Sequence, residues 1–365
     1  MWKIRVLVLV GLALGLSFAD VLAGHISFGT ITTGFITKYH ELPAGTFIQD
    51  LSGAATDGKV IVFADDGGNL SNSPSRPPAF IRVVSGGLPD TQAVNVPLAL
   101  EHKDLEGATF RNGVFAVITS HSKAGSENQP FRRLTRFKLR EDTNQLKLQD
   151  EKSVDLRDPI MAALQTFGQA QFGNDDWSNR IKNADERAGG LNIEGLSTTG
   201  DDIGESLYLG LLGPLFGPCF ANPTCPNNLG IGEAIVVKVR NPFSSEPSFE
   251  FTKLNLLTAR ANHGIKGMEL IPAMKGFVII GGPVERGGDF SLWFWDGDAE
   301  LERLDLPDTE PGNFGNVFRK LCRPEAVIPM EEKGEDLLVV FSEHSTPQCA
   351  NVPFTFIKAH YRARK

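Results

Sequence analysis

A short motif recurs five times along the chain, and it restricts the possible folds more than any other feature of the sequence. Each copy reads broadly polar-apolar-X-Gly and leads into a second apolar run, and the last copy has Ala326 in place of the glycine. Further β-rich runs follow, bounded by Gly, Pro, Asn and Asp, which is the pattern of short strands joined by turns. Four strands per unit, repeated along the chain, predict a β-propeller. The copies begin at Asp50, Asp104, Asn192, Gly264 and Arg323.

The two ends of the chain predict how the ring closes. The fifth copy has three strands, and residues 25–31 form an unassigned strand before the first copy. Pairing them would complete the fifth sheet and cover an exposed edge. We therefore expect an all-β fold, a β-propeller of five four-stranded blades closed by an N-terminal strand. Six blades is the alternative if the insertion between the second and third copies contains strands.

That insertion, residues 158–190, reads as a small helical insertion because Ile160, Met161, Leu164 and Phe167 fall at helical spacing. Packing onto the propeller explains these apolar residues. The insertion belongs to a crossover on the face that carries the long loops, so we also consider it a candidate lid. Functional residues concentrate on loops held by a rigid scaffold, and we expect function on that face.

Residues 1–23 have the order of a secretory signal peptide, with two basic residues, an apolar run from Val6 to Phe18 and small residues before Gly24. The apolar run is shorter than the ~20 residues that a spanning helix needs. We expect an exported protein, periplasmic or extracellular. Its mature part, residues 24–365, should be a single propeller domain and a monomer without a membrane span.

The net charge of the chain disfavours some classes of binding partner. Residues 1–23 contain Lys3, Arg5 and Asp20, so their removal changes the net charge from −8 to −9. An acidic chain is a poor match for nucleic acid or an anionic membrane. We expect the partner to be a small molecule or a protein of the cell envelope.

Four cysteines in an exported protein predict two disulfides. Cys219 and Cys225 fall in one loop, and Cys322 and Cys349 fall in the last unit, so we pair them in that way. A zinc site is the alternative, which the separation of the two pairs into different units disfavours.

The third motif position should ring the central channel, because the first strand of each propeller unit is innermost. Side chains two residues apart on a strand share a face, so the first position joins this ring. Close acids repel one another and raise each other's pKa, so either basic side chains and water or a bound cation must balance them. A salt-bridged channel lining is the plainer interpretation. The candidate ligand-binding residues are Asp104, Glu106, Glu194, Lys266, Arg323 and Glu325.

The ends of the second strands add candidate metal ligands and bases. Asp65, Asp66 and Glu343 offer the hard oxygen ligands that Ca²⁺ or Mg²⁺ prefers. His121 and His344 occupy equivalent positions and are candidate catalytic bases. Their units are not adjacent, and a lone loop histidine is more often a surface hydrogen-bonding group. The sequence contains no nucleophile elbow, phosphate-binding loop or zinc-protease helix motif.

Two resemblances accompany these motifs. The third unit, with Ile193-Glu194-Gly195-Leu196 leading to Gly213-Pro214, resembles a family of bacterial propeller proteins catalogued as domain of unknown function 3616. The resemblance spans most of the chain from Asp50 to Phe356 and implies the fold, with no activity attached. The Ser52-Gly53 opening and the Asp65-Asp66 end are also similar to the esterase-like phytase propellers, over little sequence.

Two functional hypotheses follow. The first is an exported ligand-binding or interaction propeller with an acidic channel mouth that can hold a cation. The second is a metal-dependent hydrolase of the phytase-like phosphoesterase type. The first hypothesis is preferred because no group of residues in the sequence indicates a catalytic reaction.

Overall fold

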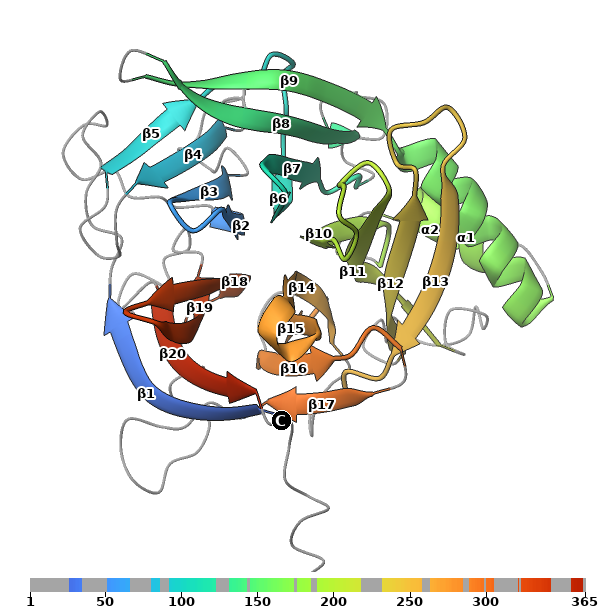
Figure 1. The fold of residues 1–365 in the computed structure, drawn as a ribbon. Coiled ribbons are helices and arrows are strands. Elements are labelled where there is room, and N and C mark those ends of the chain that lie inside the picture. Colours follow the sequence, from blue (N-terminus) through green and yellow to red (C-terminus); the bar gives the residue numbers. More distant parts are fainter. Residues whose placement is uncertain are drawn as a thin grey trace, which may run out of the picture.

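The described residues of the computed structural model are 26–34, 51–65, 80–85, 92–122, 131–142, 145–173, 176–184, 189–217, 232–257, 263–284, 289–298, 300–304, 321, 323–342 and 356–363. They form five four-stranded antiparallel sheets arranged around a central axis (Figure 1). This arrangement is a β-propeller, as the repeated motif predicts.

Each sheet is a meander of consecutive strands, with one exception in the fifth. The first sheet contains β2 (Leu51–Thr56), β3 (Val60–Asp65), β4 (Phe80–Ser85) and β5 (Gln92–Val96). The second contains β6 (Leu105–Arg111), β7 (Val114–Thr119), β8 (Arg133–Asp142) and β9 (Gln145–Asp155). The third contains β10 (Asn192–Ser197), β11 (Ser206–Phe216), β12 (Glu233–Arg240) and β13 (Ser248–Leu254).

The fourth sheet contains β14 (Gly264–Ile271), β15 (Gly276–Gly282), β16 (Ser291–Trp295) and β17 (Leu301–Leu304), with the short 3-10 helix η4 (Pro272–Met274) between its first two strands. The fifth sheet contains β18 (Pro324–Glu332), β19 (Glu335–Ser342) and β20 (Phe356–Ala363), and its outer strand is β1 (Ile26–Gly34).

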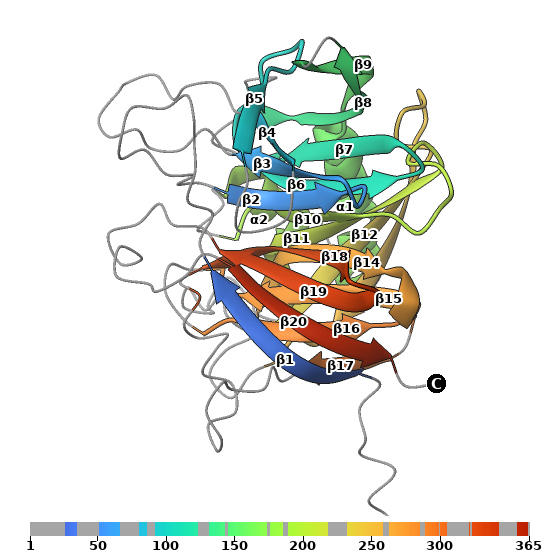
Figure 2. The ribbon, with the colours of Figure 1, turned by 60° about the vertical axis from the view of Figure 1, so that its left-hand side comes forward.

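The N-terminal strand completes the fifth sheet. β1 pairs antiparallel with β20, from Ile26 opposite Ala363 to Gly34 opposite Phe356. The first strand of each sheet lies nearest the axis and contacts its counterpart in the next sheet, and β18 contacts β2. Figure 2 shows β1 running along the outside of the fifth sheet. The predicted pairing of the two chain ends is therefore present.

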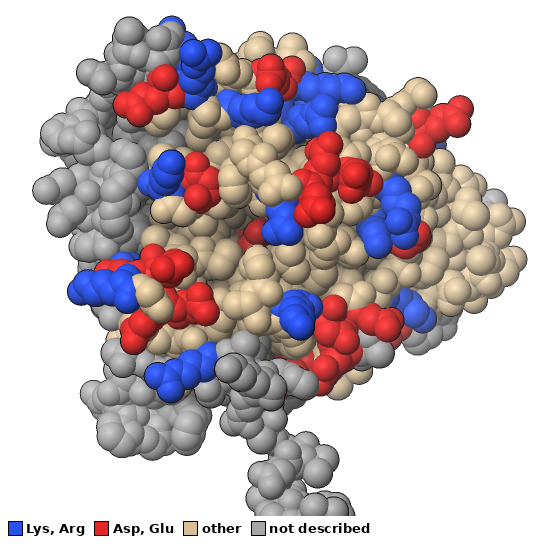
Figure 3. All heavy atoms as spheres, in the orientation of Figure 1, with Lys and Arg blue, Asp and Glu red and all other residues tan. Residues whose placement is uncertain are grey.

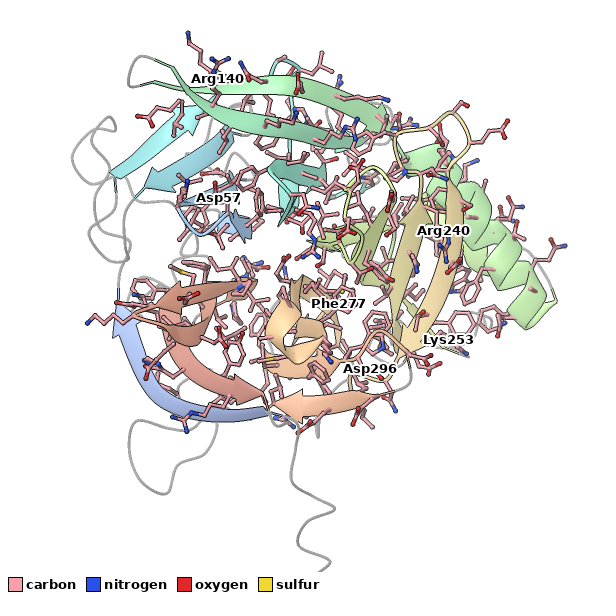
Figure 4. The ribbon with its side chains drawn as sticks, in the orientation of Figure 1. Asp57, Arg140, Arg240, Lys253, Phe277 and Asp296 are labelled. Atoms are coloured by element: carbon pink, nitrogen blue, oxygen red, sulfur yellow. The ribbon has the colours of Figure 1, made fainter. Side chains whose placement is uncertain are left out.

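One face of the propeller carries short turns between the first and second strands and between the third and fourth strands. At the turn after β2, the Asp57 carboxylate accepts hydrogen bonds from the backbone N–H groups of Lys59 and Val60, both at 2.8 Å. Asp296 does the same for Asp298 and Glu300 at the turn after β16. Asp57 and Asp296 face the viewer in Figure 4, so this view looks onto the short-turn face.

Apolar side chains fill the space between neighbouring sheets. Phe63 of the first sheet meets Phe341 of the fifth edge-on, with ring centroids 5.0 Å apart. Tyr208 of the third sheet lies 4.8 Å from Phe277 of the fourth, again between centroids. Both faces of each sheet are thus buried against a neighbour, which explains why the strands read as apolar runs.

The insertion is helical, as predicted, and its helices lie along the third sheet rather than over the axis, where a lid was considered. It contains α1 (Arg157–Phe172) and α2 (Asp176–Asn183). Phe167 of α1 stacks on Phe251 of β13 with centroids 4.8 Å apart, and Trp177 of α2 is fully buried beneath the same helix. Figure 1 shows both helices along the outer edge of the third sheet, away from the axis. Their apolar residues cover the side of that sheet and belong to its hydrophobic core.

Several predictions fall outside the described residues. These are the signal peptide and the cysteines Cys219, Cys225, Cys322 and Cys349. Export and the two disulfides therefore remain predictions. Within the described ranges, no helix has the length and apolar character that crossing a membrane requires.

Candidate functional site

A β-bulge in the innermost strand of every sheet directs the third motif residue toward the axis. In β2, Leu51 pairs with Asp65 and Gly53 pairs with Ala64, so Ser52 is an extra residue between consecutive pairs. The same register shift occurs at the third motif position of β6, β10, β14 and β18. A bulge re-aims a side chain and is a common device next to functional sites. The bulged residues are Ser52, Glu106, Glu194, Lys266 and Glu325.

The glycine after the bulge allows adjacent sheets to approach closely. A Cβ on Gly53 would lie 2.6 Å from the carbonyl oxygen of Glu106, and a Cβ on Gly107 would lie 2.7 Å from the Cβ of Leu196. Neither distance is compatible with a side chain. In the fifth sheet Ala326 stands at this position, so its contact with the first sheet accommodates a methyl group. The recurring geometry of the motif therefore has a steric cause at each of these contacts.

Lys266 holds two of the axial glutamates together. Its Nζ lies 2.5 Å from Oε2 of Glu194 and 3.1 Å from Oε2 of Glu325. The three residues come from β10, β14 and β18, which are the inner strands of consecutive sheets. Their side chains are buried, with exposed fractions of 5%, 8% and 2% in chain order. The three residues form a buried ion-pair cluster, which we call the axial cluster.

Burial determines the proton affinities in the axial cluster. Burial raises the pKa of Glu194 to about 7, with a further increase from the charge of Glu325 and an opposing effect of Lys266. For Lys266, burial disfavours the ammonium form, but the carboxylates of Glu194 and Glu325 outweigh this and hold its pKa above the usual value. Lys266 is therefore charged at neutral pH, while Glu194 exchanges a proton near neutrality.

The other predicted ligand-binding residues lie around this cluster. Arg323 is about one-third exposed, and its Nη2 lies 3.6 Å from Oε1 of Glu325. Glu106 is partly exposed and acts electrostatically on Lys266. Asp104 is buried in a left-handed conformation (φ 60°) and accepts a hydrogen bond from the Ser120 hydroxyl. The structure thus brings Glu194, Lys266, Glu325 and Arg323 into one network and gives Asp104 a local structural contact.

A small cavity lies on the axis beside the cluster. Its polar lining comes from Ser52, Glu194 and Glu325, and its apolar lining includes Leu196 and Met268. The space that water can occupy inside it is about 10 Å³, which is room for about one water molecule. Figure 3 shows the centre of the short-turn face hollowed at the axis.

The candidate base His121 is fully buried. Its side chain has no exposed surface, and its Nδ1 lies 2.7 Å from the Thr119 carbonyl oxygen. Its own carbonyl oxygen accepts a hydrogen bond from Nε of Arg157, the first residue of α1, at 3.1 Å. Burial lowers the pKa of His121 to about 4, so the imidazole is neutral at physiological pH. The described contacts of His121 connect β7 to α1, and none of them is to the axial cluster.

The predicted metal ligands are only partly within the described residues. Asp65 is buried at the end of β3, whereas Asp66, Glu343 and the candidate base His344 lie outside the described ranges. Among the residues that are described, no three His, Cys, Asp or Glu side chains gather closely enough to hold a metal ion.

Two further polar residues of the inner strands contribute: Asn192, which the sequence placed at a first motif position without naming it as a candidate ligand, and Glu269, which sequence reasoning missed. Asn192 donates a hydrogen bond from Nδ2 to Oε1 of Glu194 at 2.9 Å. Glu269, three residues after the bulge of β14, is buried beside the hydroxyls of Thr109 and Ser197, and burial raises its pKa well above the usual value. A polar residue within the otherwise apolar run of β14 was the available signal for Glu269.

No family model and no curated protein matches the chain. Solved structures resemble it at low identity. The major allergen Mala s 1 of Malassezia sympodialis has 10% identity and a TM-score of 0.43, with 85% of this chain and 92% of that chain covered. A putative glucose dehydrogenase from Thermus thermophilus has 10% identity and a TM-score of 0.43, with 92% and 100% covered.

A glycoside hydrolase family 43 β-1,3-galactosidase, solved with galactodeoxynojirimycin, has 9% identity and a TM-score of 0.45, with 91% of this chain and 92% of that chain covered. The assignment of the propeller fold rests on the strand order and pairing of the chain itself.

Proposed function

We propose that this protein is an exported ligand-binding or interaction propeller and that the axial cluster is a binding element rather than a catalytic one. The observation that carries this proposal is the position of the Lys266 ammonium between the carboxylates of Glu194 and Glu325, at 2.5 and 3.1 Å. An ammonium in this position neutralises the two acids and fixes their geometry. A preorganised, buried polar group of this kind suits recognition of a small ligand.

The hydrolase alternative receives less support. A general base must reach the proton that it removes, directly or through one water. His121 is enclosed by Thr119 and Arg157 and has a lowered pKa, so it offers no proton transfer at the axis. Glu194, with a pKa of about 7, is the described axial group best suited to proton transfer, but its carboxylate and that of Glu325 are both paired with the Lys266 ammonium.

The position of Lys266 also affects whether the axial cluster binds a divalent cation. The sequence predicted a ring of acids whose charge a calcium or magnesium ion could balance. In the structure, the Lys266 ammonium lies between two of these carboxylates and balances part of their charge. Hard cations bind several oxygen ligands at once. We therefore assign no resident divalent ion to the axial cluster, and test this assignment below.

We further infer that the five sheets are the complete set of blades. The support is the contact of each inner strand with the next, including β18 with β2, which leaves no opening along the inner ring. The relationship to the domain-of-unknown-function family 3616 remains a hypothesis based on the motifs of the third unit. Size-exclusion chromatography with light scattering tests the expected monomer.

A thermal-shift screen of the full chain tests the binding function. Specific ligands stabilise the native state in proportion to the logarithm of their concentration. The screen should contain Ca²⁺, Mg²⁺, EDTA, phosphoesters, glycosides and a library of small polar molecules, with product assays run on the same phosphoesters and glycosides. We expect stabilisation by a polar ligand without turnover. Turnover that disappears in Glu194→Gln or Glu325→Gln would refute the proposal, as would destabilisation by EDTA that Ca²⁺ reverses.

A further inference from the structure

The carboxylates of Glu194 and Glu325 have Lys266 on one side and the axial cavity on another. Both glutamates line the cavity, and Lys266 is absent from the described residues that line it. The inner strands run from the bulges toward the short-turn face, and the apolar lining residues lie two positions after each bulge. The cavity therefore extends from the axial cluster toward the short-turn face, where Figure 3 shows the central hollow.

Glu325 has hydrogen-bonding capacity that the described residues do not use. Its side chain is 2% exposed, and neither carboxylate oxygen accepts a hydrogen bond of regular geometry from the described residues. Lys266 and Arg323 lie 3.1 and 3.6 Å away as ion-pair partners. A carboxylate offers about four acceptor sites. A buried acceptor without a donor is costly, so this group favours an occupant of the cavity that donates hydrogen bonds.

The charge near the cavity favours a cationic donor. Glu106, Glu194 and Glu325 face Lys266 and Arg323, so the ionised cluster has one negative charge in excess. Burial is the main cause that raises the pKa of Glu194, and the charge of Glu325 adds to it, so both effects disfavour the ionised carboxylate. A further positive group would stabilise both carboxylates.

The cavity restricts the size and shape of such a group. Room for about one water molecule also accommodates one ammonium nitrogen. The lining beyond the carboxylates is apolar, and suits methylene groups rather than a polar body. That lining is formed by Ala54, Ala108, Leu196, Met268 and Val327.

We propose that the axial cavity binds a primary ammonium group on a narrow alkyl chain, with its N–H groups donating to the carboxylates of Glu194 and Glu325. This proposal rests on the proposed binding function and names the ligand class for the same site. The cavity has room for the ammonium group itself, and the alkyl chain extends out of it toward the central hollow of the short-turn face (Figure 3). A quaternary ammonium lacks N–H donors and is too wide for the cavity, so it is excluded.

Isothermal calorimetry and thermal shift on the full chain test this assignment with methylammonium, n-butylammonium, tetramethylammonium and potassium chlorides at equal ionic strength. We expect the two primary ammonium ions to bind and stabilise, and tetramethylammonium and potassium to do neither. Glu325→Gln should weaken binding by about tenfold or more, because a hydrogen bond to a charged group is lost. Glu250→Gln is the matched control: it removes one charge beside Arg240, on the outer strands of the third sheet (Figure 4), and should leave binding unchanged.

A second variant avoids any change of charge. Ala108→Leu fills the cavity with methyl groups and should abolish ammonium binding while Glu194, Lys266 and Glu325 remain in place. The proposal is overturned if no primary ammonium binds, if tetramethylammonium or potassium binds equally, or if Glu325→Gln and Ala108→Leu both bind normally. If amines fail but another compound stabilises the protein and loses its effect in Ala108→Leu, the ligand class is wrong and the binding function stands. If no compound stabilises the protein, both the ammonium assignment and the proposed binding function are wrong.

Discussion

Replacing Lys266 by methionine tests the role of the axial cluster most directly. Methionine keeps the length of the side chain and removes the ammonium that lies 2.5 Å from Glu194 and 3.1 Å from Glu325. The variant leaves two carboxylates buried side by side, with 5% and 2% of their side chains exposed. Arg323, 3.6 Å from Glu325, remains as a neighbouring cation.

The expected loss of stability in Lys266→Met follows from two opposing contributions, the attraction between the charges and the cost of removing them from water. At an effective dielectric constant of about 20, unit charges at these two distances attract by about 7 and about 5 kcal/mol. Withdrawing each charged group from water costs several kcal/mol, so the intact cluster contributes little net stability. Removing one partner abolishes the attraction and keeps the desolvation cost of the carboxylates. We therefore expect Lys266→Met to lower the free energy of unfolding by about 3–5 kcal/mol at alkaline pH.

The loss should depend on pH. Because the folded pKa of Glu194 is raised to about 7, folding favours its protonated form, and the stability that this proton provides is lost as pH rises through about 7. Without the ammonium, the Glu194 carboxyl should hold its proton more strongly, so the variant is affected least in acid. Urea unfolding at about pH 5.5 and about pH 8.5 measures this difference.

A neutral triple variant provides the control. Glu194→Gln, Lys266→Met and Glu325→Gln together remove all three charges, and should recover most of the lost stability because no unpaired charge stays buried. Equal destabilisation of Lys266→Met at the two pH values, or a loss below about 1 kcal/mol at both, would contradict the electrostatic reasoning.

Three further expectations concern other parts of the fold. Burial lowers the pKa of His102, His121 and His263 to about 4, so the unfolded chain binds more protons between about pH 4 and 6.5. Each neutral imidazole should therefore contribute roughly 2–3 kcal/mol above about pH 6.5 that is lost as pH falls toward 4, measurable as a falling urea midpoint. Gly267→Ala would place a methyl group against the carbonyl oxygen of Glu325 and should cost about 1–3 kcal/mol, whereas Ala326→Gly should cost less than about 1. Peptide mapping without reduction should recover the two predicted cysteine pairs, and any crossed pairing would disprove that assignment.

The sequence was sufficient to predict the parts of the fold that depend on periodicity. Apolar runs, turn residues and the repeated motif located all five inner strands, and the three-strand fifth unit implied the pairing of β1 with β20. The motif also identified Glu194, Lys266 and Glu325 as axial residues, because every copy puts its third residue at the same bulge. Local pattern and global fold agree at these positions.

The parts that depend on three-dimensional neighbours were not predictable in this way. The helical insertion follows a crossover, but Phe167 and Trp177 pack on the side of the third sheet rather than at the axis (Figure 1). His121 follows a strand end, which suggested a loop residue, yet Arg157 encloses it because α1 begins there. A sequence pattern predicts the order of helices and strands along the chain. It does not predict which helix packs against which strand, and these contacts depend on that packing.

The charge balance and the cavity at the axis come from the two positions that depart from the repeat, not from the repeat itself. Five identical acids at the bulges would repel one another and could not be buried together. Lys266 interrupts this series between Glu194 and Glu325, in consecutive sheets, so its ammonium reaches both. Ser52 interrupts it again with a side chain too short to fill its share of the ring, and the axial cavity lies against it. One substitution therefore supplies the charge that permits burial and the other supplies the space, and a ligand that uses this axis must match the asymmetry that the two create.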